Sequence, residues 1–262
     1  MSDRPRRSLL VLSGGHPYEE APFNELIHSL GDWEVTHLVH PEAEHAVAAG
    51  AADHAYALLF YDMGGYEFAD GKVTSRPPSE EFKQALRRRF ASGRGAVAMH
   101  HALAGWAEWP EWANMLGGRF LYQPGAWKER QVPDSGYRHD VEYNAEVVAE
   151  HPVTRDLPCQ FALCDELYLA QIDEESVNPL IRAQHNFTRD GFYSAAKAVA
   201  GEMFTNDGWD HPPGSNLSAW WKMVDTAPLV YLQFGDGPQT YTNPHVRHAI
   251  ANALEFTAGE MK

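Results

Sequence analysis

Two adjacent histidines, His100 and His101, stand at the end of a short apolar run, Ala96 to Met99. Such a run is typical of a strand buried on both faces of a parallel sheet. In open α/β sheets the carboxyl ends of the strands border the ligand crevice, and a sharp strand-to-helix turn there directs a side chain into it. Histidine exchanges protons near neutral pH and binds metals, so we expect His100 to be a catalytic acid–base group or a metal ligand.

Each of these histidines has a structural alternative, in which the ring is packed in the core and bonded to the backbone. The position of His100 at the strand end favours the functional interpretation for that residue. For His101 the two interpretations remain open, because its side chain could point into the covering helix instead of contacting substrate.

Two further side chains follow neighbouring strands of the predicted sheet. His16 comes after a strand over 8–13, and Asp62 comes after a strand over 56–61. Because these strands should lie beside the one that precedes His100, we expect the three side chains to converge on a substrate. Two imidazoles and a carboxylate suit acid–base chemistry or a metal site, in which His16 and His100 would be the ligands and zinc the expected divalent ion. Asp62 could equally cap the next turn.

A pair of carboxylates, Asp165 and Glu166, lies in an extended segment over 161–170. Side chains alternate across a strand, so one carboxylate should face inward and the other outward. A buried carboxylate needs a partner such as histidine or arginine. From the residues alone, these carboxylates are either part of a functional site or a surface acid and a structural salt bridge, and both alternatives stay open.

The elements that must position these residues alternate between strands and helices. Phe23, Leu26, Ile27 and Leu30 share one helical face, and Ser79 is a predicted N-cap for a helix with Phe82, Leu86 and Phe90 on its inner face. Further strands are predicted over 34–39 and 229–234, and a last helix after Asn243-Pro244. This alternation predicts an α/β fold with a doubly wound, mainly parallel sheet and helices on both faces.

Two long irregular segments, about 119–160 and 184–216, interrupt this pattern and are predicted to cover the site of a single domain over 1–262. The first contains Arg138 and His139, for which solvated turn chemistry is the default for a loop and contact with substrate hydroxyls is the functional alternative. Trp106 and Tyr168 are expected to contribute rings to substrate binding, because flat rings with a polar edge can stack on a ligand, whereas most of the tryptophans are expected to pack in the core or in lids.

Composition excludes several classes of protein. The 262 residues include 36 acidic and 21 basic side chains, a net charge of −15, which argues against nucleic acid as a partner. No apolar run is long enough to cross a bilayer, and Ser8 to Leu12 is too short for a signal sequence, so no membrane partner is expected. Cys159 and Cys164 form no disulfide framework, which favours a cytoplasmic location. The oligomeric state is left open, a homo-oligomer being one alternative.

Motifs along nearly the whole chain resemble the trehalose-utilisation (ThuA-like) family, which shares the class I glutamine amidotransferase-like fold, related to flavodoxin. The motifs are Ser13-Gly14-Gly15-His16, Tyr61-Asp62-Met63, Met99-His100-His101-Ala102, Leu116-Gly117-Gly118-Arg119-Phe120, His151-Pro152-Val153-Thr154, Asp165-Glu166-Leu167-Tyr168, Ala219-Trp220-Trp221 and Tyr241-Thr242-Asn243-Pro244. The chain departs from the family's pattern at Leu121-Tyr122-Gln123, at Lys222 and at Gly235-Asp236, where histidines are common.

This resemblance implies a role in carbohydrate metabolism, with a small sugar or keto-glycoside as the partner. It also implies a catalytic role for at least one of Asp165 and Glu166. His100 stands where amidotransferase relatives place a nucleophilic cysteine, so cysteine-dependent amidotransferase activity is not expected. The leading hypothesis is a hydrolase or isomerase that uses histidine acid–base or metal-assisted chemistry. A non-catalytic sugar-binding or scaffold protein and a metal-dependent amidase-type hydrolase are the alternatives.

Overall fold

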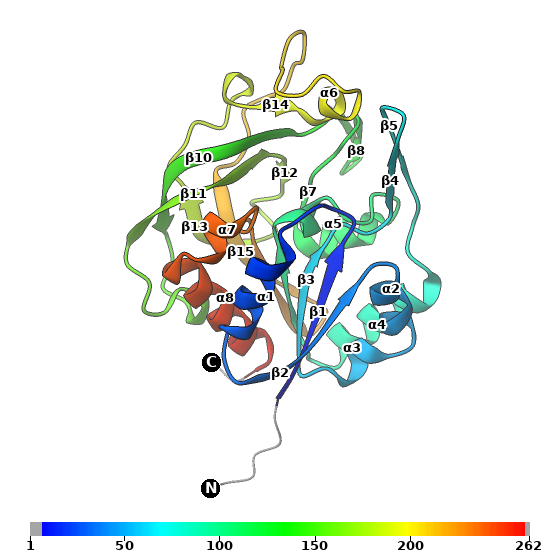
Figure 1. The fold of residues 1–262 in the computed structure, drawn as a ribbon, viewed down its shortest axis with the longest axis vertical. Helices are drawn as coiled ribbons and strands as arrows, with labels where there is room; N and C mark the ends of the chain where they lie inside the picture. Colours follow the sequence, from blue (N-terminus) through cyan, green and yellow to red (C-terminus); the bar gives the residue numbers. More distant parts are fainter. Residues whose placement is uncertain (1–6, 260–262) are drawn as a thin grey trace, which may run out of the picture.

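Five parallel strands form the centre of the computed structural model, which describes residues 7–259 (Figure 1). They are β1 (Arg7–Gly14), β2 (Trp33–Val39), β3 (Ala57–Asp62), β6 (Ala96–Met99) and β16 (Ala227–Leu232), and they lie in the order β16-β6-β3-β1-β2. Every residue of β3 and β6 is buried, as expected for strands covered on both faces. The predicted α/β fold with a parallel centre is confirmed, and so is the adjacency of the strands that precede His16, Asp62 and His100.

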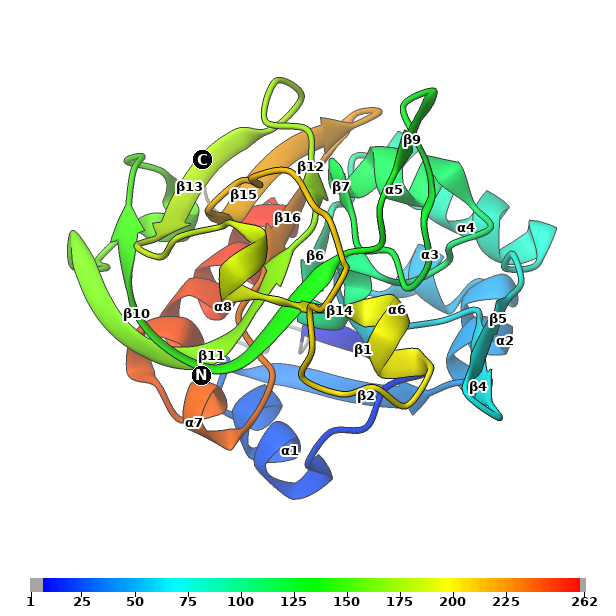
Figure 2. The ribbon, with the colours of Figure 1, turned by 90° about the horizontal axis from the view of Figure 1, so that it is seen from above.

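Antiparallel strands extend this sheet beyond β16, so that the whole sheet is mixed. They are β15 (Leu217–Val224), β13 (Asn178–Ala183), β10 (Gly136–Val147) and β11 (Gln160–Leu169), with β14 (Tyr193–Ser194) paired to β10. The extended segment over 161–170 corresponds to β11, whereas the other antiparallel strands were not predicted from the sequence. Figure 2 shows β10 and β11 curving together at the side of the molecule opposite the β4–β5 hairpin (Tyr66–Ala69 and Lys72–Ser75).

Helices cover both faces of the sheet and create two hydrophobic cores. On one face, Phe23 and Ile250 pack with Leu9 and Val11 of β1. The alternate residues of β1 face the other core, because successive side chains of a strand point to opposite sides. The first face carries α1 (Glu20–His28), α7 (Pro238–Tyr241) and α8 (Pro244–Thr257), and the second carries α2 (Glu42–Ala48), α3 (Ala51–His54), α4 (Glu80–Ala91) and α5 (Pro110–Leu116).

Two of the predicted helix starts are confirmed by their caps. The Ser79 hydroxyl accepts a hydrogen bond from the backbone N–H of Phe82 at the start of α4. The Asn243 side chain accepts from the N–H groups of His245 and Val246 at the start of α8. Each cap satisfies amides that a helix leaves without an internal partner.

The remaining elements are short and connect the larger ones. They are β7 (Gly118–Arg119), β8 (Gly125–Trp127), β9 (Arg130–Val132), β12 (Gln171–Ile172), α6 (Ala195–Val199) and the 3₁₀ helices η1 (His100–Leu103), η2 (Pro152–Thr154) and η3 (Arg189–Gly191). Within residues 7–259, none of the helices combines the length and apolar character that crossing a bilayer requires.

Candidate active site

His100 follows β6 directly and opens η1 with a backbone φ of 43°. This left-handed conformation is uncommon for a residue other than glycine. Two neighbours hold it: the Tyr231 hydroxyl donates to the His100 carbonyl at 3.0 Å, and His100 Nδ1 donates to the Gln233 carbonyl at 2.5 Å. A carbonyl can only accept, so Nδ1 carries a proton and Nε2 is the atom that can exchange one. The sharp turn expected at the end of β6 is therefore present.

The other ring nitrogen of His100 faces a polar cluster. Nε2 lies 2.9 Å from the Tyr168 hydroxyl, 3.1 Å from Glu166 Oε2 and 3.7 Å from Asp236 Oδ1. The prediction that this ring projects into an open crevice is wrong, because the residue is 0% exposed. His100 is thus a buried partner of carboxylates that themselves lie closer to solvent.

The charges of this cluster are strongly coupled. Burial alone would lower the pKa of His100, but Asp236, Glu166 and Asp165 outweigh burial and raise the pKa to about 10. Burial would raise the pKa of Asp236, yet its interactions with His100 and His139 hold that pKa well below the usual range. Asp236 in turn raises the pKa of His139. At neutral pH the ring of His100 is an imidazolium surrounded by carboxylates.

The two carboxylates of β11 have different roles, and the expectation that only one would face inward is wrong, because both are buried. Asp165 accepts hydrogen bonds from the N–H groups of Gly235 and Asp236, so it fixes the chain after β16. Burial raises the pKa of Asp165 to about 6, although His100 and these bonds oppose the rise. Glu166 lies on the other side of β11 and contacts the histidines.

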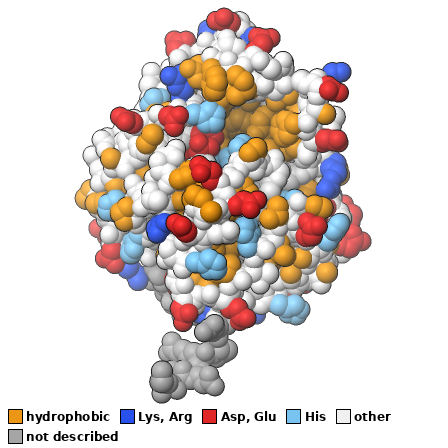
Figure 3. Space-filling view, in the orientation of Figure 1, with side chains coloured by type: hydrophobic (Ala, Val, Ile, Leu, Met, Phe, Trp, Pro, Cys, Tyr) orange, Lys and Arg blue, Asp and Glu red, His pale blue; other side chains and the backbone are white. Residues whose placement is uncertain are grey.

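A pocket of about 130 Å³ opens above Glu166. The polar part of its lining comes from Glu166, Tyr168, His16 and His139, and its remaining walls are Phe120, Tyr122, Tyr137, Ala195, Ala198 and Met203. These walls include residues of both irregular segments that were expected to cover the site. Figure 3 shows a hollow with hydrophobic side chains in its wall, on the face between α6 and the β4–β5 hairpin.

His16 and His101 meet beside this pocket. Their rings stack with centroids 3.6 Å apart, and the Tyr168 hydroxyl lies 3.1 Å from His101 Nδ1. Nε2 of His101 is buried and has no hydrogen-bond partner among the described residues. Burial lowers the pKa of both histidines, so both rings are neutral at pH 7. Tyr168 therefore joins the charged ring of His100 to the neutral ring of His101.

Asp62 and Trp106 take part in a different cluster. Asp62 Oδ2 lies 2.7 Å from His40 Nε2, and the ring of His40 is 5.4 Å from that of Trp106. Trp106 also packs against Phe82. The structure therefore brings His16 near His100 through His101 but places Asp62 in an ion pair with His40, at the end of β2.

Two residues of these clusters, Asp236 and His40, were not predicted from the sequence. Asp236 follows the exit of β16, the neighbour of β6, so its place after a predicted strand was an available signal. His40 likewise follows β2. Arg138 was predicted to contact substrate, and its guanidinium lies over the Tyr193 ring, 4.6 Å from the centroid, without lining the pocket above Glu166.

Two groups of side chains have the spacing of a metal site. In each, one ligand atom per residue lies within 4.8 Å of the others: His100, His101 and Glu166 form the first group, and His139, Glu166 and Asp236 form the second. The second group lies at the pocket and combines imidazole and carboxylate donors, a set that suits zinc. The expected ligand His16 belongs to neither group of described residues; its Nδ1 lies 2.7 Å from the Pro17 carbonyl.

Comparisons with known proteins agree on family and fold. A family model described as trehalose utilisation (ThuA) matches residues 21–257. A putative ThuA-like protein of Parabacteroides merdae has a similar structure with a TM-score of 0.67 and 14% identity, over 98% of this chain and 92% of its own. A putative ThuA-like protein of Bacteroides uniformis matches with a TM-score of 0.62 and 16% identity, over 100% of this chain and 95% of its own.

A more distant fold match is a protein of Thermoplasma acidophilum described as a putative GMP synthase subunit. Its TM-score is 0.52 at 7% identity, over 98% of this chain and 96% of the other. The match supports the amidotransferase-like α/β fold and nothing finer. No curated protein matches the sequence significantly.

Proposed function

This chain belongs to the trehalose-utilisation (ThuA) family, whose description indicates a carbohydrate-related role, and we propose that it is an enzyme acting on a small sugar or keto-glycoside. The observation that carries the proposal is the position of Glu166. This carboxylate lines the pocket, and it lies 3.1 Å from His100 Nε2 on its buried side and 3.5 Å from His139 Nδ1 on its other side.

In this proposal Glu166 is the base that takes a proton from the substrate. His139, whose side chain is 37% exposed, is the acid that returns one, because Asp236 favours its protonated form. Two groups of opposite charge at one pocket suit proton transfer between neighbouring atoms, as in an isomerase or a hydrolase. His100 is a positioning residue: its positive charge attracts the Glu166 carboxylate, and its fixed Nδ1 bond keeps that carboxylate oriented.

A metal-assisted version is the second candidate, and the group His139, Glu166 and Asp236 favours it. A zinc ion held there would polarise a substrate carbonyl or activate water. In that version His139, Glu166 and Asp236 would bind the ion. The positive charge of His100 would still balance the negative charge of Glu166 from the buried side of that carboxylate. Adding zinc after complete chelation distinguishes the versions, because acid–base chemistry alone does not need the ion.

The test is turnover of a panel of oxidised and unoxidised disaccharides by the wild type and by Glu166→Gln. Removing a general base should lower kcat by about 10²- to 10⁴-fold. Glu142→Gln is the matched control, because Glu142 is an exposed carboxylate of the neighbouring strand β10. Equal turnover by Glu166→Gln would refute the role of Glu166. Binding of a sugar by the wild type without any turnover would favour a binding protein instead.

A further inference from the structure

A cavity of about 800 Å³ lies where the strands β1, β2 and β3 end. It is lined by Gly15 after β1, His40 after β2 and Met63 after β3, and the β4–β5 hairpin completes its wall. None of the described residues lines both this cavity and the pocket above Glu166. Its volume falls within the usual range of small-molecule sites, roughly 300–1,000 Å³.

The position of this cavity corresponds to the topological switch point of the parallel sheet. Strands β1 and β3 are neighbours, but the helices that come next in the chain, α1 and α4, cover opposite faces. In open α/β sheets, ligands bind at such a point, in the crevice outside the carboxyl ends of the strands. The topology therefore indicates a ligand site here before the residue types are considered.

The ring of His40 supplies a hydrogen-bond donor to this cavity. Its Nε2 lies 2.7 Å from Asp62 Oδ2, so Nδ1 is the ring nitrogen left for a ligand. Asp62 is 1% exposed and lies behind the ring. Burial lowers the pKa of His40, but Asp62 and Glu44 outweigh burial and the opposing charge of Arg76 and raise that pKa. At about pH 6, below the ordinary histidine value of about 6.5, both ring nitrogens carry protons.

Arg76 supplies a second cation, and it is held in the same way. Glu44 lies 2.7 Å from Nη2 and 3.3 Å from Nη1, and Nη1 also donates to the Pro77 carbonyl at 3.2 Å. The Glu44 side chain is 7% exposed and that of Arg76 is 57% exposed, so the carboxylate again lies behind the cation. Among the described residues, these bonds use three of the five N–H groups of the guanidinium. The two that remain, on Nε and Nη2, share one edge and can bind two oxygens of one anion.

One aromatic ring brings the two cations to the same part of the cavity. The ring of His40 lies 5.4 Å from the ring of Trp106, and the guanidinium carbon of Arg76 lies 5.7 Å from the Trp106 centroid. Glu67 also lines the cavity, but it pairs with Thr74 further along the hairpin. Its negative charge therefore favours an anion at the end of the cavity next to His40 and Arg76.

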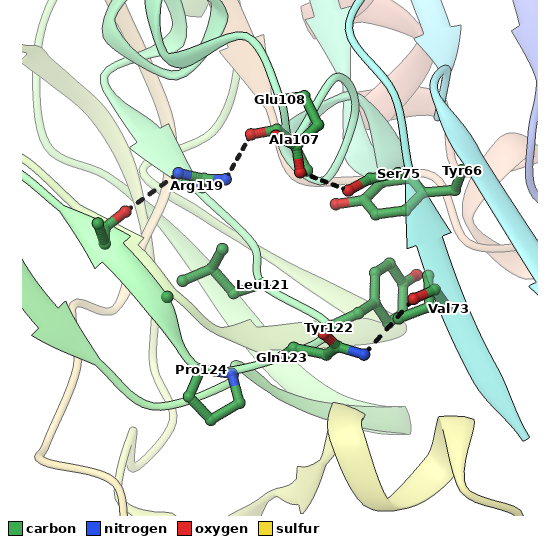
Figure 4. Close-up of a pocket in the computed structure, with 12 residues that line it drawn as sticks. Tyr66, Val73, Ser75, Ala107, Glu108, Arg119, Leu121, Tyr122, Gln123 and Pro124 are labelled. Atoms are coloured by element: carbon green, nitrogen blue, oxygen red, sulfur yellow. Dashed lines mark hydrogen bonds between the residues drawn. The ribbon is translucent and has the colours of Figure 1, made fainter.

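The remaining wall suits the uncharged part of a ligand. Met63 and Tyr66 contribute apolar surface. The Ser75 hydroxyl is already engaged, because it donates to the Glu108 carboxylate at 2.7 Å (Figure 4). The volume of the cavity also exceeds what a bare inorganic ion needs, so the expected ligand has an organic part.

We propose that this cavity binds a small organic anion, whose carboxylate or phosphate group lies between His40 and the free edge of Arg76. The buried carboxylates of Asp62 and Glu44 hold the two cations toward the ligand. This site is separate from the pocket above Glu166, and its ligand need not be the substrate of the proposed enzyme.

The experiment is titration calorimetry on the full chain at about pH 6, in Bis-Tris buffer, after dialysis against a chelator and then against buffer. The probes are benzoate, phenyl phosphate and inorganic phosphate, with benzyl alcohol as the uncharged counterpart. Arg76→Gln and His40→Gln are the test variants. Arg87→Gln is the matched control, because Arg87 is also an exposed arginine paired with a glutamate, Glu111, and its loss changes the net charge equally.

In the wild type we expect benzoate or phenyl phosphate to bind at least tenfold more tightly than benzyl alcohol and inorganic phosphate. Arg76→Gln and His40→Gln should each weaken that binding about tenfold or more, the effect of losing a hydrogen bond to a charged group, whereas Arg87→Gln should leave it within about twofold. Thermal melts report whether the variants fold, and Arg76→Gln, at an exposed position, decides the matter if His40→Gln does not.

Three results would overturn the proposal. The first is that neither organic anion binds more tightly than benzyl alcohol. The second is an affinity that Arg76→Gln leaves unchanged or that Arg87→Gln weakens equally, because the anion would then respond to net charge alone or bind elsewhere. The third is that inorganic phosphate binds as tightly as phenyl phosphate, which would exclude an organic ligand as the occupant.

Discussion

Replacing Glu166 by glutamine should weaken the folded state and flatten its dependence on pH. The reason is the buried ring of His100, which is 0% exposed beside a carboxylate that is 5% exposed. A rise in its pKa from 6.5 to about 10 corresponds to about 5 kcal/mol in favour of the charged form, at about 1.4 kcal/mol per pH unit. Three carboxylates share this effect, so losing Glu166 should cost about 2 kcal/mol at neutral pH.

The direction of the pH effect follows from the raised pKa. A histidine that holds its proton more tightly in the folded chain contributes stability that is complete below about pH 6.5. That contribution is lost as the pH rises through about 10, where the folded chain releases the proton. The wild type should therefore lose stability over this window, and Glu166→Gln should lose less.

The measurement is denaturant unfolding of the wild type, Glu166→Gln and the control Glu142→Gln, in the presence of a chelator. The chelator keeps adventitious metal from replacing the missing charge. We also expect the His100 ring, followed by nuclear magnetic resonance, to titrate at a lower pH in Glu166→Gln. Unfolding free energies that fall equally steeply with pH in the wild type and Glu166→Gln would refute the coupling.

Three further predictions concern the fold around the site. Asp62→Asn should lower the pKa of His40, because Asp62 overcomes the effect of burial and raises that pKa in the wild type. The wild-type pair therefore stabilises the fold most below about pH 6.5, and this stabilisation is lost as the pH rises through the pKa of His40 in the folded chain. Denaturation of Asp62→Asn should lack this dependence on pH. Ser79→Ala should lower the free energy of unfolding by about 1 kcal/mol through loss of the cap of α4, and an unchanged denaturation midpoint would contradict that. Gly15→Ala should lower the melting temperature far more than Gly93→Ala does. Both glycines have a φ of 81°, but an added Cβ at Gly15 would lie 2.0 Å from a backbone carbonyl oxygen, whereas at Gly93 it would meet nothing within 4 Å. Equal melting temperatures of the two variants would exclude the clash.

Local patterns were sufficient to predict the parallel half of the fold. The strand over 56–61 lies one residue from β3 (Ala57–Asp62), and Ser79 caps α4 as expected. Such features depend on apolar periodicity and on caps, which are encoded within a few residues. The antiparallel half was not predicted in the same way, because the polar residues of β10 resemble a loop until β11 and β13 pair with them.

The candidate site was predicted less completely, because its geometry depends on distant segments. Both Asp165 and Glu166 are buried, because the side of β11 that carries Glu166 packs against His100 and faces the pocket instead of open water. The alternation of side chains in a sequence predicts one solvated face of a strand, and that prediction fails where a distant segment packs against this face. Asp62 pairs with His40 for a similar reason: the end of β2 lies beside β1, but no local pattern tells which histidine reaches the carboxylate.

The turn at His100 explains how a fully buried residue can still orient a carboxylate that lines the pocket. A non-glycine residue in a left-handed conformation costs on the order of 1–3 kcal/mol and persists only where its surroundings hold it. Here Tyr231 binds its carbonyl and Gln233 binds its ring, and both come from β16 and the residues that follow. The same segment supplies Asp236, whose backbone N–H is bound by Asp165. The end of β16 and the residues after it thus fix the backbone of His100, hold its proton on Nδ1 and place Asp236 beside its ring. The other carboxylate beside Nε2 belongs to Glu166, and this is the carboxylate that lines the pocket.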